Sequence, residues 1–139
     1  MSHEHAVAFA ESGPNAAAAP VISGPWVNEM GSTMQLAVSG AIVSGTYTSA
    51  QSGGGGAVTG QLQGYVAGDL VSFQVLWPGG SITAWVGHVF VTGGSHGLIK
   101  TLWHLVTEIP SPDDPDDFWQ SILAGADDFA RPQSDGSPE

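Results

Sequence analysis

Hydroxyl and aromatic side chains alternate along several short segments of this sequence. Ser81, Thr83 and Trp85 stand two residues apart, as do Tyr47 and Ser49. Because successive side chains of a β-strand point to opposite sides, each group would share one face of a strand. Hydroxyls offer hydrogen bonds and indoles offer flat apolar surface, a combination suited to holding a small ligand. The same spacing recurs in Asn28, Met30 and Ser32, in Phe73, Val75 and Trp77, and in Thr101, Trp103 and Leu105.

Motifs for catalysis and metal binding are weaker. The segment GGSHG, residues 93–97, matches the G-x-S-x-G pattern of hydrolases, which would make Ser95 an esterase nucleophile. That pattern requires a strand before it and a helix after it, whereas strand-like segments flank Ser95 on both sides, so we interpret it as a hairpin turn. His3 and His5 form an H-x-H pair that could bind a metal weakly, but we interpret them as part of a solvated tail. His88, His96 and His104 share no metal-ligand spacing and are interpreted as surface or interface residues. The parity of His88 and His104 is opposite to that of Trp85 and Trp103, which predicts that they lie on the other face of their strands.

An acidic run, SPDDPDDF, occupies residues 111–118. It lacks the alternating ligands, the glycine and the terminal glutamate of a calcium-binding loop. Asp is, however, a favoured residue at the start of a helix. We therefore expect Asp116 or Asp117 to cap a short helical turn over residues 118–123.

Composition excludes several classes of function. The chain has 139 residues, enough for one domain, and its 20 Gly, 9 Pro and 11% charged residues favour an all-β fold with tight turns. Its net charge is −11, and Lys100 and Arg131 are its only basic residues. Such a chain has no basic surface for nucleic acid or an anionic membrane. It has no Cys, which excludes disulfides and a thiol nucleophile.

Eight segments alternate in hydrophobicity and are separated by Gly, Ser and Pro, a pattern typical of antiparallel strands. A sandwich would fill its inner face with Val, Ile and Leu, whereas a barrel of about eight strands tolerates the mixed polar and aromatic face seen here. Residues 1–22 lack the basic region and apolar run of a signal peptide, and we expect a flexible arm there and a disordered tail at 133–139. The eight segments are 25–30, 32–38, 41–49, 57–65, 69–77, 81–91, 97–107 and, more weakly, 127–131.

Five stretches, in order and approximate spacing, closely resemble the signature segments of the avidin and streptavidin family. They are GPWVNEMGST, SGTYTSA, SITAWVGH, KTLWHL and FWQSILAGADDF, and the resemblance covers roughly residues 24–131. It implies an eight-stranded antiparallel up-and-down β-barrel over residues 23–132. It also implies non-enzymatic, non-covalent biotin binding with high affinity, one site per subunit and no cofactor.

The resemblance assigns the polar side chains to parts of biotin. Three positions match the donors to the ureido oxygen of biotin: Asn28, Ser32 and Tyr47. Three converging donors favour a polarised oxygen, as the donors of an oxyanion hole do. Ser49 and Asp127 match the acceptors for the two ureido N–H groups. Burying a carboxylate is costly unless it is hydrogen-bonded, so we expect Asn28 to be a partner of Asp127. The remaining polar positions are Thr83 for the thioether sulfur and Ser81 and Gln51 for the carboxylate end.

Apolar positions and assembly are implied in the same way. Trp119 matches the indole that a neighbouring subunit inserts over the ligand, which favours a homotetramer over a dimer. Trp26 has no such role and is expected in the core. Secreted or periplasmic location is implied by resemblance alone. Alternatives that remain are a lipocalin-like barrel for another apolar ligand and, less favoured, an esterase using Ser95. The positions implied to surround the ligand are Met30, Trp77, Trp85, Trp103, Leu105 and Trp119.

Overall fold

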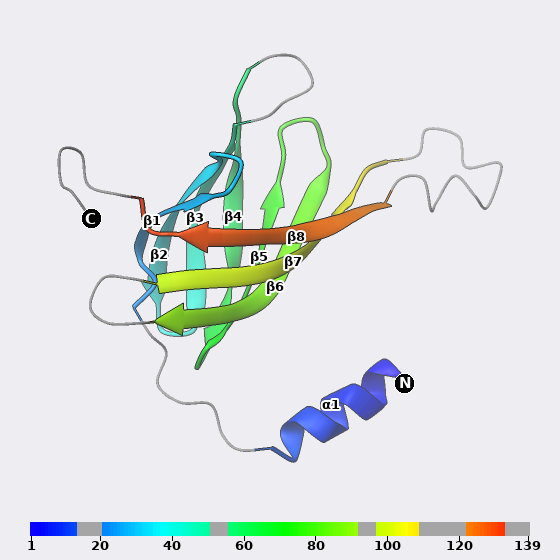
Figure 1. The fold of residues 1–139 in the computed structure, drawn as a ribbon. Coiled ribbons are helices and arrows are strands. Elements are labelled where there is room, and N and C mark those ends of the chain that lie inside the picture. Colours follow the sequence, from blue (N-terminus) through cyan, green and yellow to red (C-terminus); the bar gives the residue numbers. More distant parts are fainter. Residues whose placement is uncertain (14–20, 51–55, 92–96, 109–121, 133–139) are drawn as a thin grey trace, which may run out of the picture.

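A computed structural model describes residues 1–13, 21–50, 56–91, 97–108 and 122–132 (Figure 1). Eight strands form one closed barrel in which each strand pairs antiparallel with the next along the chain and β1 pairs with β8. The up-and-down all-β barrel expected from the sequence is therefore confirmed. The elements are α1 (His3–Glu11), β1 (Gly24–Asn28), β2 (Thr33–Ser39), β3 (Ile42–Ser49), β4 (Val58–Ala67), β5 (Leu70–Leu76), β6 (Ile82–Val91), β7 (Gly97–Val106) and β8 (Ile122–Ala130).

Two tight hairpins carry the residues that the sequence placed at a ligand site. In the first, the backbone N–H of Asn28 donates to Ser32 O at 2.9 Å across a three-residue loop. In the second, Trp77 N–H donates to Ser81 O at the same distance. Each loop ends in a glycine with positive φ, Gly31 at 86° and Gly80 at 102°. Glycine adopts a positive φ without the backbone strain that other residues have there, so each three-residue turn closes and fixes the flanking residues on their strands.

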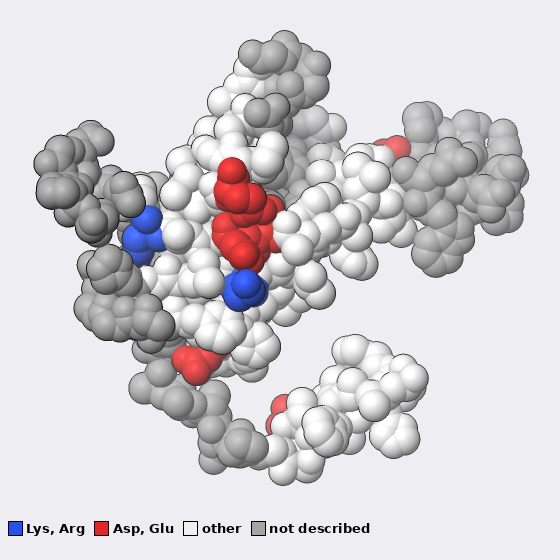
Figure 2. Space-filling view, viewed as in Figure 1, with Lys and Arg blue, Asp and Glu red and all other residues white. Residues whose placement is uncertain are grey.

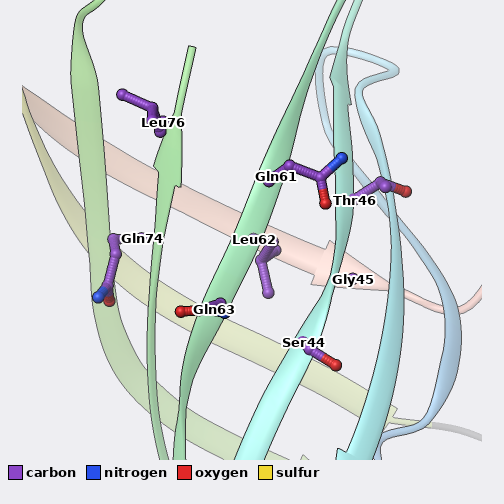
Figure 3. A pocket seen from close by; sticks show the side chains of 8 residues that line it. All are labelled: Ser44, Gly45, Thr46, Gln61, Leu62, Gln63, Gln74 and Leu76. Atoms are coloured by element: carbon purple, nitrogen blue, oxygen red, sulfur yellow. The ribbon is translucent and has the colours of Figure 1, made fainter.

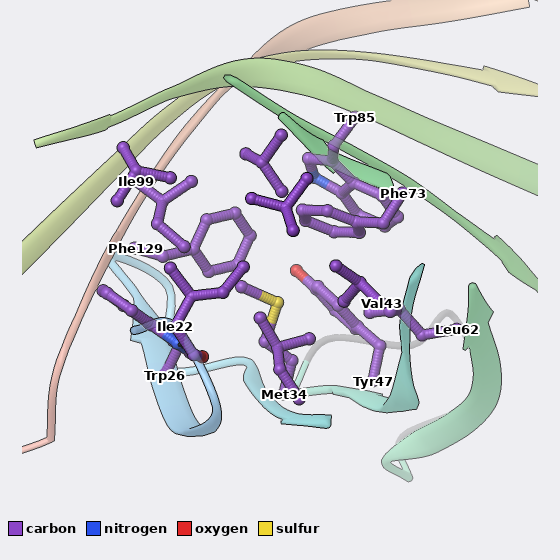
Figure 4. Packing of buried hydrophobic residues seen from close by; sticks show 14 of the residues in the cluster. Ile22, Trp26, Met34, Val43, Tyr47, Leu62, Phe73, Trp85, Ile99 and Phe129 are labelled. Carbon is purple, nitrogen blue, oxygen red and sulfur yellow. Dashed lines mark hydrogen bonds between the residues drawn. The ribbon is translucent and has the colours of Figure 1, made fainter. Parts of the chain in front are cut away.

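Side chains of alternating positions fill the barrel, as the period-two pattern predicted (Figure 4). Trp26 is 1% exposed and donates from Nε1 to Ile22 O at 2.9 Å, and the Arg131 guanidinium lies 4.1 Å from the centre of its ring. This cation–π contact and the hydrogen bonds of Arg131 to Pro25 O and Val21 O close one end of the barrel. Trp26 is thus a core residue, as expected.

The start of β8 differs from the sequence-based expectation. Ile122 and Leu123, expected in a helical turn, belong to β8 and pair with Val106 and Leu105 of β7. The capping preference of an acidic run is local, and pairing along the full length of β7 overrides it. Residues 109–121 lie outside the described residues.

The expected N-terminal arm is partly structured. It contains α1, whose first turn is capped by Ser2 Oγ accepting from His5 N at 3.1 Å, and no residue of this helix is buried. Ile22, at the end of the arm, is 1% exposed and packs in the barrel core. No helix among the described segments combines the length and apolar character needed to cross a membrane.

Candidate functional site

Three buried donors meet at one corner of the barrel interior. The Asn28 side-chain oxygen accepts from the backbone N–H groups of Met30 at 3.0 Å and Ser32 at 2.9 Å, which locks the amide in the β1–β2 turn. This leaves Asn28 Nδ2 facing the hydroxyl of Tyr47 at 3.2 Å. Ser32 Oγ accepts from Ala50 N at 3.0 Å and retains its own proton to donate. A ligand atom that is a strong hydrogen-bond acceptor could therefore accept from several donors that are already fixed in place.

Tyr47 is held in its protonated form. Burial raises the pKa of its hydroxyl, and the nearby negative charge of Asp127 raises it further, while a hydrogen bond with Ser32 lowers it. A protonated phenol can donate a hydrogen bond, so Tyr47 completes the donor corner.

Asp127 supplies an acceptor near that corner. It lies half-buried on β8, and its Oδ2 accepts from Trp85 Nε1 at 2.9 Å. Burial raises the pKa of this carboxyl, and the hydrogen bond from Trp85 acts in the opposite direction. Asn28, the partner expected from the sequence, lowers the pKa as well but contributes less than Trp85. Thr101 Oγ1 donates to the backbone oxygen of Asp127 at 3.0 Å and so anchors this residue to β7.

Aromatic rings wall the site on the side of β5 and β6. The Trp85 ring stacks with Tyr47, at a centroid distance of 4.8 Å, and with Phe73, at 5.0 Å (Figure 4). Trp77 meets Tyr47 edge-on at 5.6 Å and donates from Nε1 to Thr83 Oγ1 at 2.9 Å. These contacts hold the indoles rigidly, so little side-chain entropy remains to be lost when a ligand arrives.

Glycine makes room for the third indole. A Cβ built on Gly125 of β8 would lie 2.6–3.1 Å from three ring atoms of Trp103. The register places Trp103 opposite Gly125, so the indole lies over the bare backbone of β8. A site with several fixed donors, one carboxylate acceptor and three tryptophans suits a flat, apolar ligand that has one polar edge.

The family that these features suggest was tested by comparison with known proteins. A model described as the Avidin family matches residues 16–132. The chain belongs to the avidin family.

Solved structures similar to the chain agree with this assignment. AVR2 is 28% identical with a TM-score of 0.73, over 85% of this chain and 100% of that chain. The rhizavidin–biotin complex is 28% identical with a TM-score of 0.66, over 86% and 98%. A biotin binding protein from chicken is 28% identical with a TM-score of 0.69, over 81% and 96%. A search of curated proteins found no match. An avidin-like barrel is therefore favoured over a lipocalin-like one.

Most of the positions singled out by resemblance to the avidins face the barrel interior. Met30 is an exception: it lies at the tip of the β1–β2 turn and is 60% exposed, because the strand alternation that predicted an inward position ends at Asn28. Gln51, Trp119 and Ser95 lie outside the described residues. Ser81 lies half-buried at the end of the turn between β5 and β6, just before the first residue of β6. The interior positions are Asn28, Ser32, Tyr47, Ser49, Trp77, Thr83, Trp85, Trp103, Leu105 and Asp127.

Three residues of the site were missed by sequence reasoning. Phe129 meets the Tyr47 ring edge-on at 6.1 Å, and its position two residues after Asp127 was a usable signal. Thr101 anchors the backbone of Asp127, and it was recognised only as sharing the parity of Trp103. Glu29 approaches β8 from the neighbouring turn, and no sequence signal reports that contact.

Two histidines of the strands point away from the barrel interior. His88 and His104 are exposed on the outside of the barrel, as their parity predicted. Across the residues that the structure describes, no group of three or more His, Asp or Glu side chains is arranged to hold a metal ion.

Open hollows also lie on the outside of the barrel. One, of about 470 Å³, lies over β3, β4 and β5, where Gln61, Gln63 and Gln74 extend from the sheet (Figure 3). Another, of about 490 Å³, lies over β5, β6 and β7 and includes Val86 and Leu102. Neither combines a fixed carboxylate acceptor with converging donors, so the interior remains the candidate ligand site.

Proposed function

We propose that this protein binds biotin non-covalently inside the barrel, with one site per subunit and no cofactor. The observation that carries the proposal is the donor corner of Asn28, Ser32 and Tyr47 with Asp127 nearby. A ureido group has one polarised oxygen flanked by two N–H groups. It therefore needs converging donors with acceptors beside them, which is the chemistry available at this corner.

Each part of biotin has a proposed partner. The ureido oxygen accepts from the donor corner, and the two ureido N–H groups donate to Ser49 and Asp127. The thioether sulfur lies near Thr83, and the carboxylate of the valeryl chain lies near Ser81 and Gln51. The bicyclic ring and chain pack against tryptophans, whose flat faces bury apolar surface at low entropic cost. The proposed indoles are Trp77, Trp85, Trp103 and, from a neighbouring subunit, Trp119.

We further propose that the protein is a binding protein rather than an enzyme. Nucleophilic catalysis by a hydroxyl requires a general base within hydrogen-bonding reach. Among the described hydroxyls of the interior, Ser32 accepts from a backbone N–H and Thr83 accepts from Trp77. The imidazoles of His88 and His104 lie on the opposite side of their strands. This arrangement supports tight binding without chemical change.

The direct test is a calorimetric titration with biotin, run beside a variant. Wild-type protein should bind one biotin per subunit, and Tyr47→Phe should bind more weakly while keeping its melting temperature within a few degrees. A lipid-like apolar ligand, in place of biotin, tests the lipocalin-like alternative, and a chromogenic ester tests the esterase. Absence of biotin binding by the folded wild-type protein would refute the proposal.

We also propose a homotetramer, which is secreted or periplasmic as the family resemblance implies. The outer face of the barrel supports self-association, because soluble monomers rarely expose a large contiguous apolar surface. The strand register places Val86 beside Leu102 and Ile82 beside Val106 on this face. The exposed large apolar side chains of β5, β6 and β7 are Leu70, Leu76, Ile82, Val86, Phe90, Leu102 and Val106. Light scattering of the purified protein distinguishes monomer, dimer and tetramer.

A further inference from the structure

Glu29 lies where the barrel closes between its first and last strands. β1 and β8 pair at Asn28 and Phe129, so the next position along each strand brings Glu29 beside Asp128. The Glu29 Oε2 atom accepts from the backbone N–H of Asp128 at 3.0 Å. This bond joins residues 99 positions apart and holds a carboxylate one residue away from Asp127. Figure 2 shows acidic side chains gathered over this part of the surface.

The charged groups around Asp127 are not balanced. From β7, Lys100 Nζ lies 3.4 Å from Asp128 Oδ2 and offsets that charge. From β3, Tyr47 faces Asp127 with a protonated hydroxyl, and from β6 the Trp85 indole donates to it. From the β1–β2 turn comes Glu29, for which no ion pair exists among the described residues. One uncompensated carboxylate therefore stands next to the carboxyl group proposed to accept a ligand N–H.

We propose that Glu29 is a positioning residue for Asp127, and that the two carboxyl groups, held side by side, set the lower pH limit of ligand binding. The inference rests on the proposed role of Asp127 as acceptor for a ureido N–H. The ionised carboxylate accepts from that N–H and from Trp85 more strongly than the neutral acid does, because its hydrogen bonds are charge-assisted and neither oxygen carries a proton. A proton on Asp127 therefore competes with the ligand.

The electrostatics agree with this geometry. Besides burial, the charge of Glu29 and a hydrogen bond between the two carboxyl groups raise the pKa of Asp127. Two adjacent carboxyl groups ionise reluctantly together because their like charges repel. Ligand affinity should then fall as the pH drops through the pKa of Asp127 in the free protein. For a single competing proton, the Kd rises about tenfold for each pH unit below that midpoint.

Glu29→Gln separates charge from structure. The Gln side-chain oxygen can still accept from Asp128 N–H, so the β1–β8 closure is kept while the negative charge is removed. The midpoint of the affinity profile should therefore move to lower pH than in the wild type. Asp128→Asn is the matched control: it removes a neighbouring negative charge that Lys100 already offsets. Its midpoint should move less than that of Glu29→Gln.

The experiment measures biotin affinity by titration between pH 4 and pH 8 for the wild type and both variants. Thermal melting at each pH confirms that all three proteins stay folded. In parallel, carboxyl NMR follows the titration of Asp127 in the protein without biotin. The proposal predicts that Glu29→Gln lowers the Asp127 midpoint in both measurements.

Two outcomes overturn the inference. One is an Asp127 titration that is the same in the wild type and in Glu29→Gln. The other is an equal shift of the affinity midpoint in Asp128→Asn and in Glu29→Gln, which would mean that any nearby surface charge has the same effect. If the wild type binds no biotin at any pH, the proposed function fails, while the NMR titration still decides whether Glu29 acts on Asp127.

Discussion

Replacing Asp127 by Ala removes the carboxylate proposed to accept a ureido N–H of biotin. In the free protein this carboxylate accepts a hydrogen bond from Trp85 Nε1 at 2.9 Å. The variant lacks that bond both with and without ligand, so its loss cancels from the binding free energy. What remains is the bond to the ligand. A hydrogen bond to a charged group contributes about 1.5–3 kcal/mol. The Kd should therefore rise roughly 10- to 150-fold.

Trp85 should stay in place in this variant. Its ring stacks with both Tyr47 and Phe73, and these two contacts should hold the indole when the hydrogen bond to Asp127 is lost. The effect of Asp127→Ala can then be assigned to the lost acceptor rather than to a collapsed site. Calorimetric titration with biotin at pH 7.5 measures it.

The neighbouring carboxylate provides the control. Asp128 is exposed and pairs with Lys100, and exposed ion pairs contribute little. Asp128→Ala should change the binding free energy by less than about 0.5 kcal/mol. A larger loss for Asp128→Ala than for Asp127→Ala would refute the reasoning, because it would mean that the side chains of β8 face the opposite way.

Asp127→Asn tests the cost of this carboxylate to the fold. The pKa of Asp127 is raised in the folded protein, so the folded state binds its proton more tightly than the unfolded state does. The resulting stabilisation is present below the unfolded pKa and is lost as the pH rises through the folded pKa. Asn stays neutral and can still accept from Trp85. Thermal melting from pH 3 to pH 8 measures the effect. The wild type should lose stability as the pH rises through the pKa of Asp127, and Asp127→Asn should lose less over the same range.

Further substitutions test other parts of the site. Tyr47→Phe should weaken biotin binding by about 1–3 kcal/mol, because the ureido oxygen loses a donor; an unchanged dissociation rate would remove Tyr47 from the site. Gly125→Ala should lower both melting temperature and biotin affinity, because its Cβ would meet the Trp103 ring at 2.6 Å; unchanged values would contradict that contact. Trp119→Lys should speed biotin release and loosen the assembly together, and normal release from an intact tetramer would assign Trp119 to the core. Biotin amides should lose less affinity than ureido-modified analogues, because a loop of only three residues at 78–80 would leave the proposed carboxylate end open; equal losses would argue against that opening.

The sequence by itself determined the barrel and most of its lining. Period-two alternation assigns faces without knowledge of the fold, because side chains of a strand point alternately to its two sides. Spacing therefore grouped Thr83 with Trp85 on one face of a strand and placed His88 on the opposite face. The resemblance to the avidins then indicated that the face of Thr83 and Trp85 is the inner one. The order of signature segments then distinguished an avidin-like barrel from other closed barrels.

Alternation failed where the chain leaves a strand or where local preferences compete. Met30 kept the parity of Asn28 but lies in a turn, where parity has no meaning. Ile122 follows an acidic run that favours a helix start, yet it pairs with Val106. The hydrogen bonds of the β1–β2 turn decided the position of Met30, and pairing with β7 decided that of Ile122; a single sequence reports neither.

Only the tertiary structure decided the contacts that β8 makes with residues far from it in the sequence. Closure of the barrel brings Glu29 to the backbone of Asp128 and Trp85 to the carboxylate of Asp127, across 99 and 42 positions. The environment of Asp127, and with it the pH at which it ionises, follows from those contacts. Sequence spacing fixes which way each side chain points, but only the register of distant strands fixes which side chains meet.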